Sequence, residues 1–118
     1  MEDLKAKFLL LRDTIPTETV DVPGVGAVTV RGLTAAGRDE WEQRIWNAKG
    51  RTLTNVRASL VAMCVYQDGK PLFTSDDVKD IGDMPATLID HLYDVAMRLS
   101  GMGGKDKDTI EGNSATAR

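Results

Sequence analysis

Apolar and polar positions alternate along this chain with two different periods, and the changes of period divide the chain into short elements. Leu4, Phe8 and Leu11 recur at helical spacing, so the pattern predicts a short helix over residues 3–12. Pro16 ends this segment, because the residue before a proline is disfavoured in helical dihedrals. The chain therefore begins with a short helix that has one apolar face.

Two strand-like runs follow this helix. Residues 18–22 and residues 27–31 each alternate valine with polar or small residues, which is the period of a half-buried strand. Between them stands Pro23-Gly24-Val25-Gly26, a composition typical of a tight connection. We therefore expect a β-hairpin.

Helical spacing returns after the hairpin and continues to about residue 100. Helices are expected over residues 35–48, residues 55–66, a short segment capped by Thr74 or Ser75, and a last helix from Pro85 to about Ser100. Residues 55–66 are apolar almost all round, so a buried strand is an alternative there; the length and the Asn55 cap favour a helix. The last helix carries the strongest amphipathic pattern.

These elements predict an α+β, mainly helical fold, with a small N-terminal β-hairpin packed with four to five helices. The length of 118 residues fits one domain, which we place at residues 1–102. Residues 103–118 contain one large aliphatic side chain, Ile110, and are interpreted as a flexible C-terminal tail. The composition, 42% hydrophobic and 28% charged, is that of an ordinary globular protein.

Charge and cysteine content exclude several classes of protein. The net charge of −3 argues against nucleic acid as the main partner, since phosphate binding needs a clustered basic excess. One cysteine allows no internal disulfide, which fits a reducing compartment. The run Phe8-Leu9-Leu10-Leu11 is too short for a signal peptide or a membrane span. We expect a soluble intracellular protein without a membrane partner.

Candidate catalytic and metal-binding residues are few. His91, the only histidine, lies at the margin of the last helix's apolar face, and Cys64 lies on the most apolar segment, where a thiol behaves as a small hydrophobe. A hydrolase would require these two side chains to converge in a cleft. The acids Asp76, Asp77, Asp80 and Asp83 lack the order of a calcium loop and are interpreted as helix-start acids. No enzyme, metal or cofactor is expected.

Surplus apolar residues point instead to protein interaction. Leu9 and Leu10 widen the apolar face of the first helix, and Trp46 stands about 140° from Trp41 around its helix. Methionines offer adaptable apolar surface, and tryptophan is frequent among binding hot spots. The candidate interaction residues are Leu9, Leu10, Trp46, Met63, Met97 and Met102.

The order and spacing of several weak motifs resemble a known family. After the leading helix come TETVDVPGVGAVTVRGLTAAGRDEWE, then NVRASLVAMCVYQDGKPLFTSDDVKDIGDMPA, then an aliphatic helix that ends in AMRLSGM, and last a tail with GNSA. This order resembles that of the tail assembly chaperones of siphophages over about residues 4–114. The chain departs from it at Pro23-Gly24-Val25-Gly26, where similar chains often carry an aromatic residue.

The resemblance implies a chaperone of bacteriophage tail assembly rather than an enzyme. Such a protein binds the tape measure protein, keeps it soluble, helps to recruit tail tube subunits, and forms homo-oligomers. The resemblance further implies action in the host cytoplasm, absence from the mature virion, and a longer frameshift product that contacts the tail tube protein. The alternative is a small structural adaptor or connector of the tail.

Overall fold

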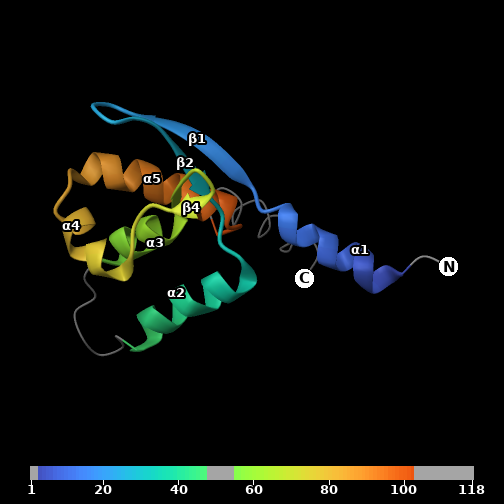
Figure 1. Cartoon of the computed structure of the whole chain (residues 1–118). Coiled ribbons are helices and arrows are strands. Elements are labelled where there is room, and N and C mark those ends of the chain that lie inside the picture. Colours follow the sequence, from blue (N-terminus) through green and yellow to red (C-terminus); the bar gives the residue numbers. More distant parts are fainter. Residues whose placement is uncertain (1–2, 48–54, 103–118) are drawn as a thin grey trace, which may run out of the picture.

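The chain folds into a mixed α+β body with two helices attached at its periphery (Figure 1). The computed structural model describes residues 3–47 and 55–102, without the side chains of residues 45–47. Within this part of the chain, helices predominate and accompany one four-stranded antiparallel sheet. The expected α+β, mainly helical class is confirmed.

The helices and strands follow in the order α1, η1, β1, β2, α2, α3, β3, β4, η2, α4 and α5. The N-terminal elements are α1 (Leu4–Leu10), the 3-10 turn η1 (Leu11–Asp13), β1 (Thr17–Val22), β2 (Gly26–Arg31) and α2 (Ala35–Asn47). The remaining elements are α3 (Val56–Cys64), β3 (Val65–Gln67), β4 (Lys70–Pro71), η2 (Ser75–Asp77), α4 (Val78–Gly82) and α5 (Ala86–Leu99).

The expected hairpin is present and has a regular register. β1 pairs antiparallel with β2, with Val20 opposite Val28 and Glu18 opposite Val30. This register places Val20, Val22 and Val30 on one face, where all three are buried. The strand alternation seen in the sequence therefore does specify which face of the hairpin enters the core.

The sheet is larger than predicted. Val65 pairs with Val30, so β3 continues the sheet from β2, and β4 returns beside β3. The expectation that the third helix extends to residue 66 was wrong beyond Cys64, because Val65 adopts an extended conformation with φ −87° and ψ 126°. A helix and a strand thus share one continuous apolar run.

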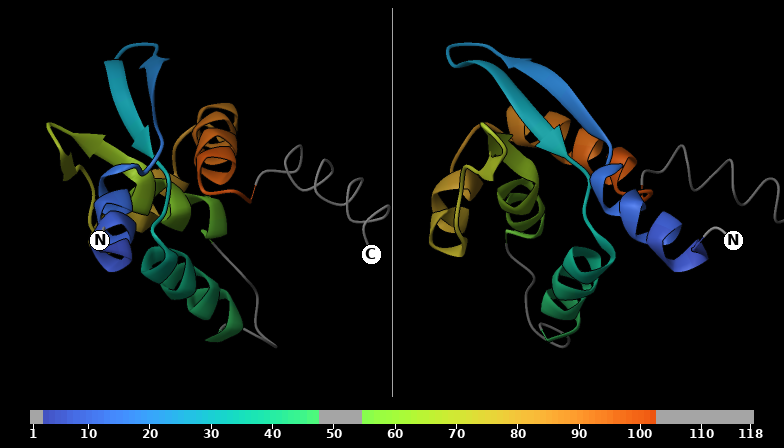
Figure 2. Two further views of the ribbon diagram at one scale, coloured as in Figure 1. Left: turned by 90° about the vertical axis from the view of Figure 1, so that its right-hand side faces the viewer. Right: turned by 45° about the vertical axis from the view of Figure 1, so that its right-hand side comes forward.

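The core lies between α3, α5 and the inner face of the sheet. Leu60, Val61 and Cys64 of α3 are almost completely buried, and α5 contributes Ile89, Leu92, Val95 and Ala96. In Figures 1 and 2, α3 runs through the middle of the molecule, with α5 on one side and α2 on the other.

Close backbone approaches join the ends of this core. A Cβ atom on Gly32 would lie 2.4 Å from the carbonyl oxygen of Leu99, so only glycine fits between β2 and the end of α5. The backbone N–H of Leu33 donates to Oγ of Ser100 at 2.9 Å, which ties the start of the α2 segment to the same place.

Candidate functional site

The two candidate catalytic residues, His91 and Cys64, do not line a common surface hollow among those described. His91 is exposed on α5, whereas Cys64, the last residue of α3, is buried. Neither residue lines any of the three surface hollows described below. Burial raises the pKa of the Cys64 thiol from 9.0 to about 12, although a hydrogen bond with Ser100 acts in the opposite direction. A thiol with this pKa is not a nucleophile at neutral pH.

Asp76, Asp77 and Asp80 lie in first turns of helices, as expected, whereas Asp83 is the C-cap of α4, so the expectation was wrong for Asp83. Thr74 and Asp77 form a capping box: the N–H of Thr74 donates to Oδ2 of Asp77 at 2.8 Å, and the N–H of Asp76 donates to Oγ1 of Thr74 at 3.3 Å. Among the described residues, no group of three histidine, cysteine or acidic side chains could hold a metal ion. None of the helices described is long and apolar enough to cross a membrane.

The main candidate site is a groove of about 970 Å³ between α2 and the body, which we call the α2 groove. Its walls are formed by α2, by α3, and by the segment from β4 through η2 to the start of α4. The described residues that line it are Ala36, Asp39, Glu40, Trp41, Gln43, Arg44, Ser59, Ala62, Met63, Pro71, Phe73, Thr74, Ser75 and Val78.

One buried contact positions α2 and thereby shapes the α2 groove. The indole Nε1–H of Trp41 donates to Oγ of Ser59 at 3.1 Å, and the Ser59 hydroxyl donates to the carbonyl of Val56 at 2.7 Å. Trp41 is the only buried side chain among those described in α2, residues 35–44. Over residues 35–44 the helix is therefore held by one buried side chain, and the groove beside it is accessible.

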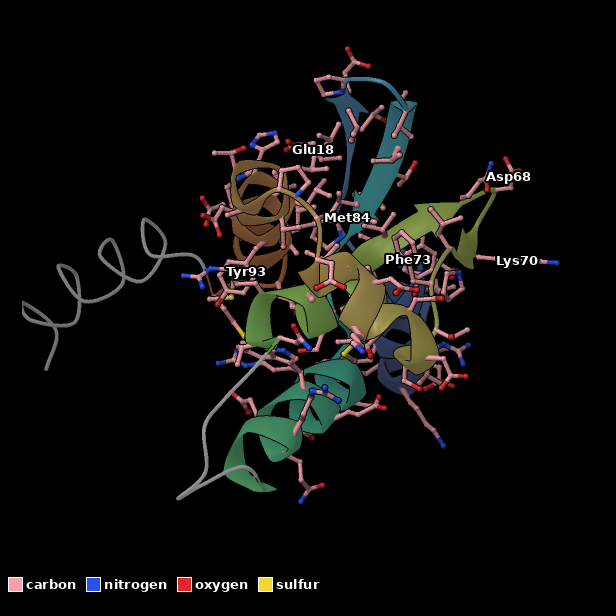
Figure 3. All side chains as sticks on the ribbon, turned by 90° about the vertical axis from the view of Figure 1, so that its left-hand side faces the viewer. Glu18, Asp68, Lys70, Phe73, Met84 and Tyr93 are labelled. Atoms are coloured by element: carbon pink, nitrogen blue, oxygen red, sulfur yellow. The ribbon has the colours of Figure 1, made fainter. Side chains whose placement is uncertain are left out.

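The floor of the α2 groove is apolar and adaptable. Trp41, Ala62 and Val78 are buried in it, while Met63 and Phe73 are partly buried. Figure 3 labels Phe73 on the segment that joins β4 to η2. An unbranched methionine beside two aromatic rings can repack around different apolar side chains. The groove thus suits an amphipathic helix or a similar apolar segment.

Acidic side chains border this apolar floor. Asp39 and Glu40 line the groove from α2, and the described lining residues of the opposite wall, such as Phe73, Thr74 and Ser75, are uncharged. Arg44 is the one cationic residue among the described lining residues. The charged groups among the described lining residues are therefore two carboxylates and one guanidinium, all on α2.

Two smaller hollows have linings that mix polar and apolar residues. One, of about 310 Å³, lies beside Arg57, which pairs with Asp90 at 3.0 Å and covers the ring of Tyr93 at 5.4 Å. The other, of about 280 Å³, lies beside Arg31 over the ring of Tyr66 at 5.3 Å. These exposed cation contacts order the surface and contribute little free energy.

The predicted interaction residues occupy different places. Leu9 and Leu10 are exposed on α1, and Met63 lines the α2 groove. The side chain of Trp46 lies outside the part of the chain that is described. Among the described positions, Leu9 and Leu10 lie away from Met63, because the only substantial contact of α1 is with η1.

Met97 and Met102 close the end of α5. The N–H of Met102 donates to the carbonyl of Met97 at 2.7 Å, and the N–H of Gly101 donates to that of Arg98 at 3.1 Å. With Gly101 at φ +76°, this is a Schellman motif, in which the flanking side chains commonly touch. Both methionines are partly buried against the core, and their role in interaction stays a prediction.

No family model, no curated protein and no solved structure matches the chain. The α2 groove and the exposed helix α1 are therefore the structural features that bear on function.

The α2 groove itself was missed from the sequence. It depends on how α2 sits against α3, and a helical period tells which side is apolar but not how far the neighbouring helix stands away. One feature of the sequence did indicate loose packing of α2: this helix has few large apolar residues among its thirteen positions. A helix of that kind packs loosely or through one anchor.

Proposed function

We propose that this protein is a tail assembly chaperone of a bacteriophage, which binds amphipathic helices of the tape measure protein and keeps that protein soluble. The observation that carries the proposal is the α2 groove, an accessible apolar trough with Asp39 and Glu40 on its α2 wall. The role is non-enzymatic and needs no cofactor. The motif order described from the sequence supplies the phage context, and the groove supplies a physical means of binding.

A tape measure protein is a long, helix-rich chain whose apolar faces aggregate when they are exposed. A chaperone prevents this aggregation if it covers such a face with adaptable apolar surface. Met63 and Phe73 supply that surface beside the rigid ring of Trp41. The acids of the α2 wall select helices whose apolar face is flanked by lysine or arginine.

The wider role follows from the same family resemblance. The chaperone acts in the host cytoplasm, self-associates, helps to recruit tail tube subunits through a longer frameshift form, and is absent from the finished virion. Binding to the tape measure protein is the step that the α2 groove supports directly, so it is the step to test first.

The test is co-expression of this chain with the tape measure protein of the same phage, followed by a pull-down and a solubility assay. The variant Ala36→Glu places a carboxylate inside the α2 groove, and Ala35→Glu places the same group on the adjacent exposed position, which does not line the groove. Wild type and Ala35→Glu should co-purify with soluble tape measure protein, whereas Ala36→Glu should lose it.

Two outcomes would contradict the proposal. If wild type fails to bind the tape measure protein, or if Ala36→Glu binds as well as Ala35→Glu, the groove is not the client site. Recovery of the chain in stoichiometric amounts from purified particles would favour the structural adaptor instead.

A further inference from the structure

Helix α1 stands away from the body of its own chain. Its only substantial contact in residues 3–47 and 55–102 is with η1, the turn that continues it, and none of its own residues is buried. Figures 1 and 2 show it extending outward from the start of β1. The helix is nevertheless formed and capped, with Oδ1 of Asp3 accepting from the N–H of Lys5 at 3.0 Å.

This arm, residues 4–13, carries an uncovered apolar stripe. Leu4, Phe8 and Leu11 fall within about 60° of arc at helical spacing. Their exposed fractions are 69%, 67% and 55%. An isolated helix of this length is marginal in water, so the stripe is expected to rest on another surface.

Basic side chains flank the stripe on both sides. Lys5 and Arg12 lie about 80–100° from Leu4 in one direction, and Lys7 lies about 60° away in the other. The arm therefore presents an apolar line with positive borders. The α2 groove presents a complementary surface, an apolar floor with Asp39 and Glu40 on its α2 wall.

We propose that the α1 arm of one chain docks in the α2 groove of a second copy, and that two copies exchange their arms reciprocally. The apolar stripe lies on Trp41, Met63 and Phe73, and the lysines of the arm face the acids on the α2 wall. Reciprocal exchange buries both arms at once and gives a closed twofold dimer, which leaves neither arm unpaired.

The connection between α1 and β1 favours a second copy over the chain's own groove. The link is short, and it is hydrogen-bonded at both ends: Thr14 Oγ1 donates to the carbonyl of Leu11 at 2.6 Å, and the N–H of Gly32 donates to the carbonyl of Pro16 at 2.9 Å. These bonds hold the arm in its outward direction. The arm is therefore accessible to the groove of a second copy rather than to the groove of its own chain.

The inference concerns the purified chain alone and does not require the phage client. It adds to the proposed function that the α2 groove is filled by another copy until a client helix displaces the arm. Failure of the client to bind would leave arm exchange intact, and failure of arm exchange would leave client binding intact, so the two are separable.

Sedimentation velocity over a concentration series tests the arm exchange. The wild-type chain should form a dimer, and Phe8→Glu should weaken the dimer by roughly tenfold or more, since it removes a buried aromatic contact. Val25→Glu is the matched control, because Val25 is 71% exposed in the hairpin turn and takes no part in the stripe. Circular dichroism should show the same fold in all three proteins.

A charge exchange tests the partner surface. Lys5→Glu and Glu40→Lys should each weaken the dimer, and the two substitutions combined in one chain should restore part of the loss, because the opposite charges are again paired. Both effects should shrink as salt is added. A loss that is simply additive would overturn the pairing of these two borders.

Disulfide capture distinguishes a second copy from the chain's own groove. Chains with Lys5→Cys are mixed with chains with Asp39→Cys, and the native Cys64 is too deeply buried to interfere. A cross-linked dimer of the two different chains supports arm exchange. A monomeric wild-type chain, a dimer unaffected by Phe8→Glu, or a cross-link formed only within a doubly substituted chain would overturn it.

Discussion

The inner body and the two outer helices of this protein differ in how many of their side chains are buried. In α3, six of nine residues are buried, and the helix contacts α5, α4 and the neighbouring segments. In α1 none is buried, and α2 has the single anchor Trp41 among its described side chains. The body thus accounts for the stability of the fold, while the outer helices offer accessible surface.

This difference in burial predicts which substitutions change folding stability and which change the binding of partners. Apolar residues in the body are already paired inside the chain, so they are unavailable to partners. Those of α1 and of the α2 groove are accessible, so they can change partners without unfolding the core.

Leu60→Ala should destabilise the body strongly. Leu60 is fully buried in α3, and removal of such a side chain costs about 2–5 kcal/mol through lost burial and the cavity that remains. Leu10→Ala on α1 is the control and should change stability by less than about 0.5 kcal/mol in the monomeric Phe8→Glu background. Urea unfolding measures both, and equal losses would contradict the division between the two regions.

Gly32→Ala should disturb the joint between β2 and α5. The added Cβ would meet the backbone of Leu99, which cannot rotate away as a side chain would, and overpacking of this kind costs about 1–3 kcal/mol. Thermal unfolding measures the loss. An unchanged melting temperature would show that the end of α5 can shift without cost.

High pH should weaken the body through Cys64. The pKa of this thiol is about 12 in the folded chain and 9.0 when it is exposed, so above pH 9 the unfolded chain releases a proton that the folded chain keeps. Stability should therefore fall as the pH rises from 9 towards 12, by at most about 1.4 kcal/mol per pH unit.

Cys64→Ala isolates the contribution of the thiol from those of other groups that titrate at high pH. Urea unfolding at pH 8 and pH 10 should show a steeper decline for wild type than for this variant. Identical slopes would mean that the thiol ionises equally in both states.

Trp41→Phe should have the smallest effect on global stability and a local effect on α2. It keeps an aromatic ring in place and removes the Nε1–H that donates to Ser59, a loss of about 1 kcal/mol. Hydrogen exchange should accelerate in α2 and stay slow in α3. Equal acceleration in both helices would show that α2 is part of the cooperative body.

Much of the fold could be predicted from the sequence, because its elements have clear periods. The hairpin, α5 and the capped start at Thr74 were predicted from alternation, amphipathic spacing and capping residues, and the structure contains all three. β3 was missed, since an apolar run with no polar face fits a buried helix and a buried strand equally.

A local signal for the second hairpin was present in the sequence. Asp68 and Gly69 both have positive φ, 53° and 79°, which is the geometry that Asp-Gly pairs favour in two-residue hairpin turns. The Asp-Gly pair predicts the turn, but the strands on either side of it, β3 and β4, were not predicted. The α2 groove could not be predicted, because it depends on the distance between α2 and α3 in space, which the helical period of neither helix specifies.

The short strand β4 has a consequence for the protein at high concentration. β4 has two residues, Lys70 and Pro71, and Figure 3 shows Asp68 and Lys70 projecting from the tip of its hairpin. Proline lacks the N–H that an incoming strand would need, and a lysine at a sheet edge resists further pairing. The sheet therefore cannot extend from chain to chain through β4, and a protein with exposed apolar surface is protected there against fibrillar aggregation.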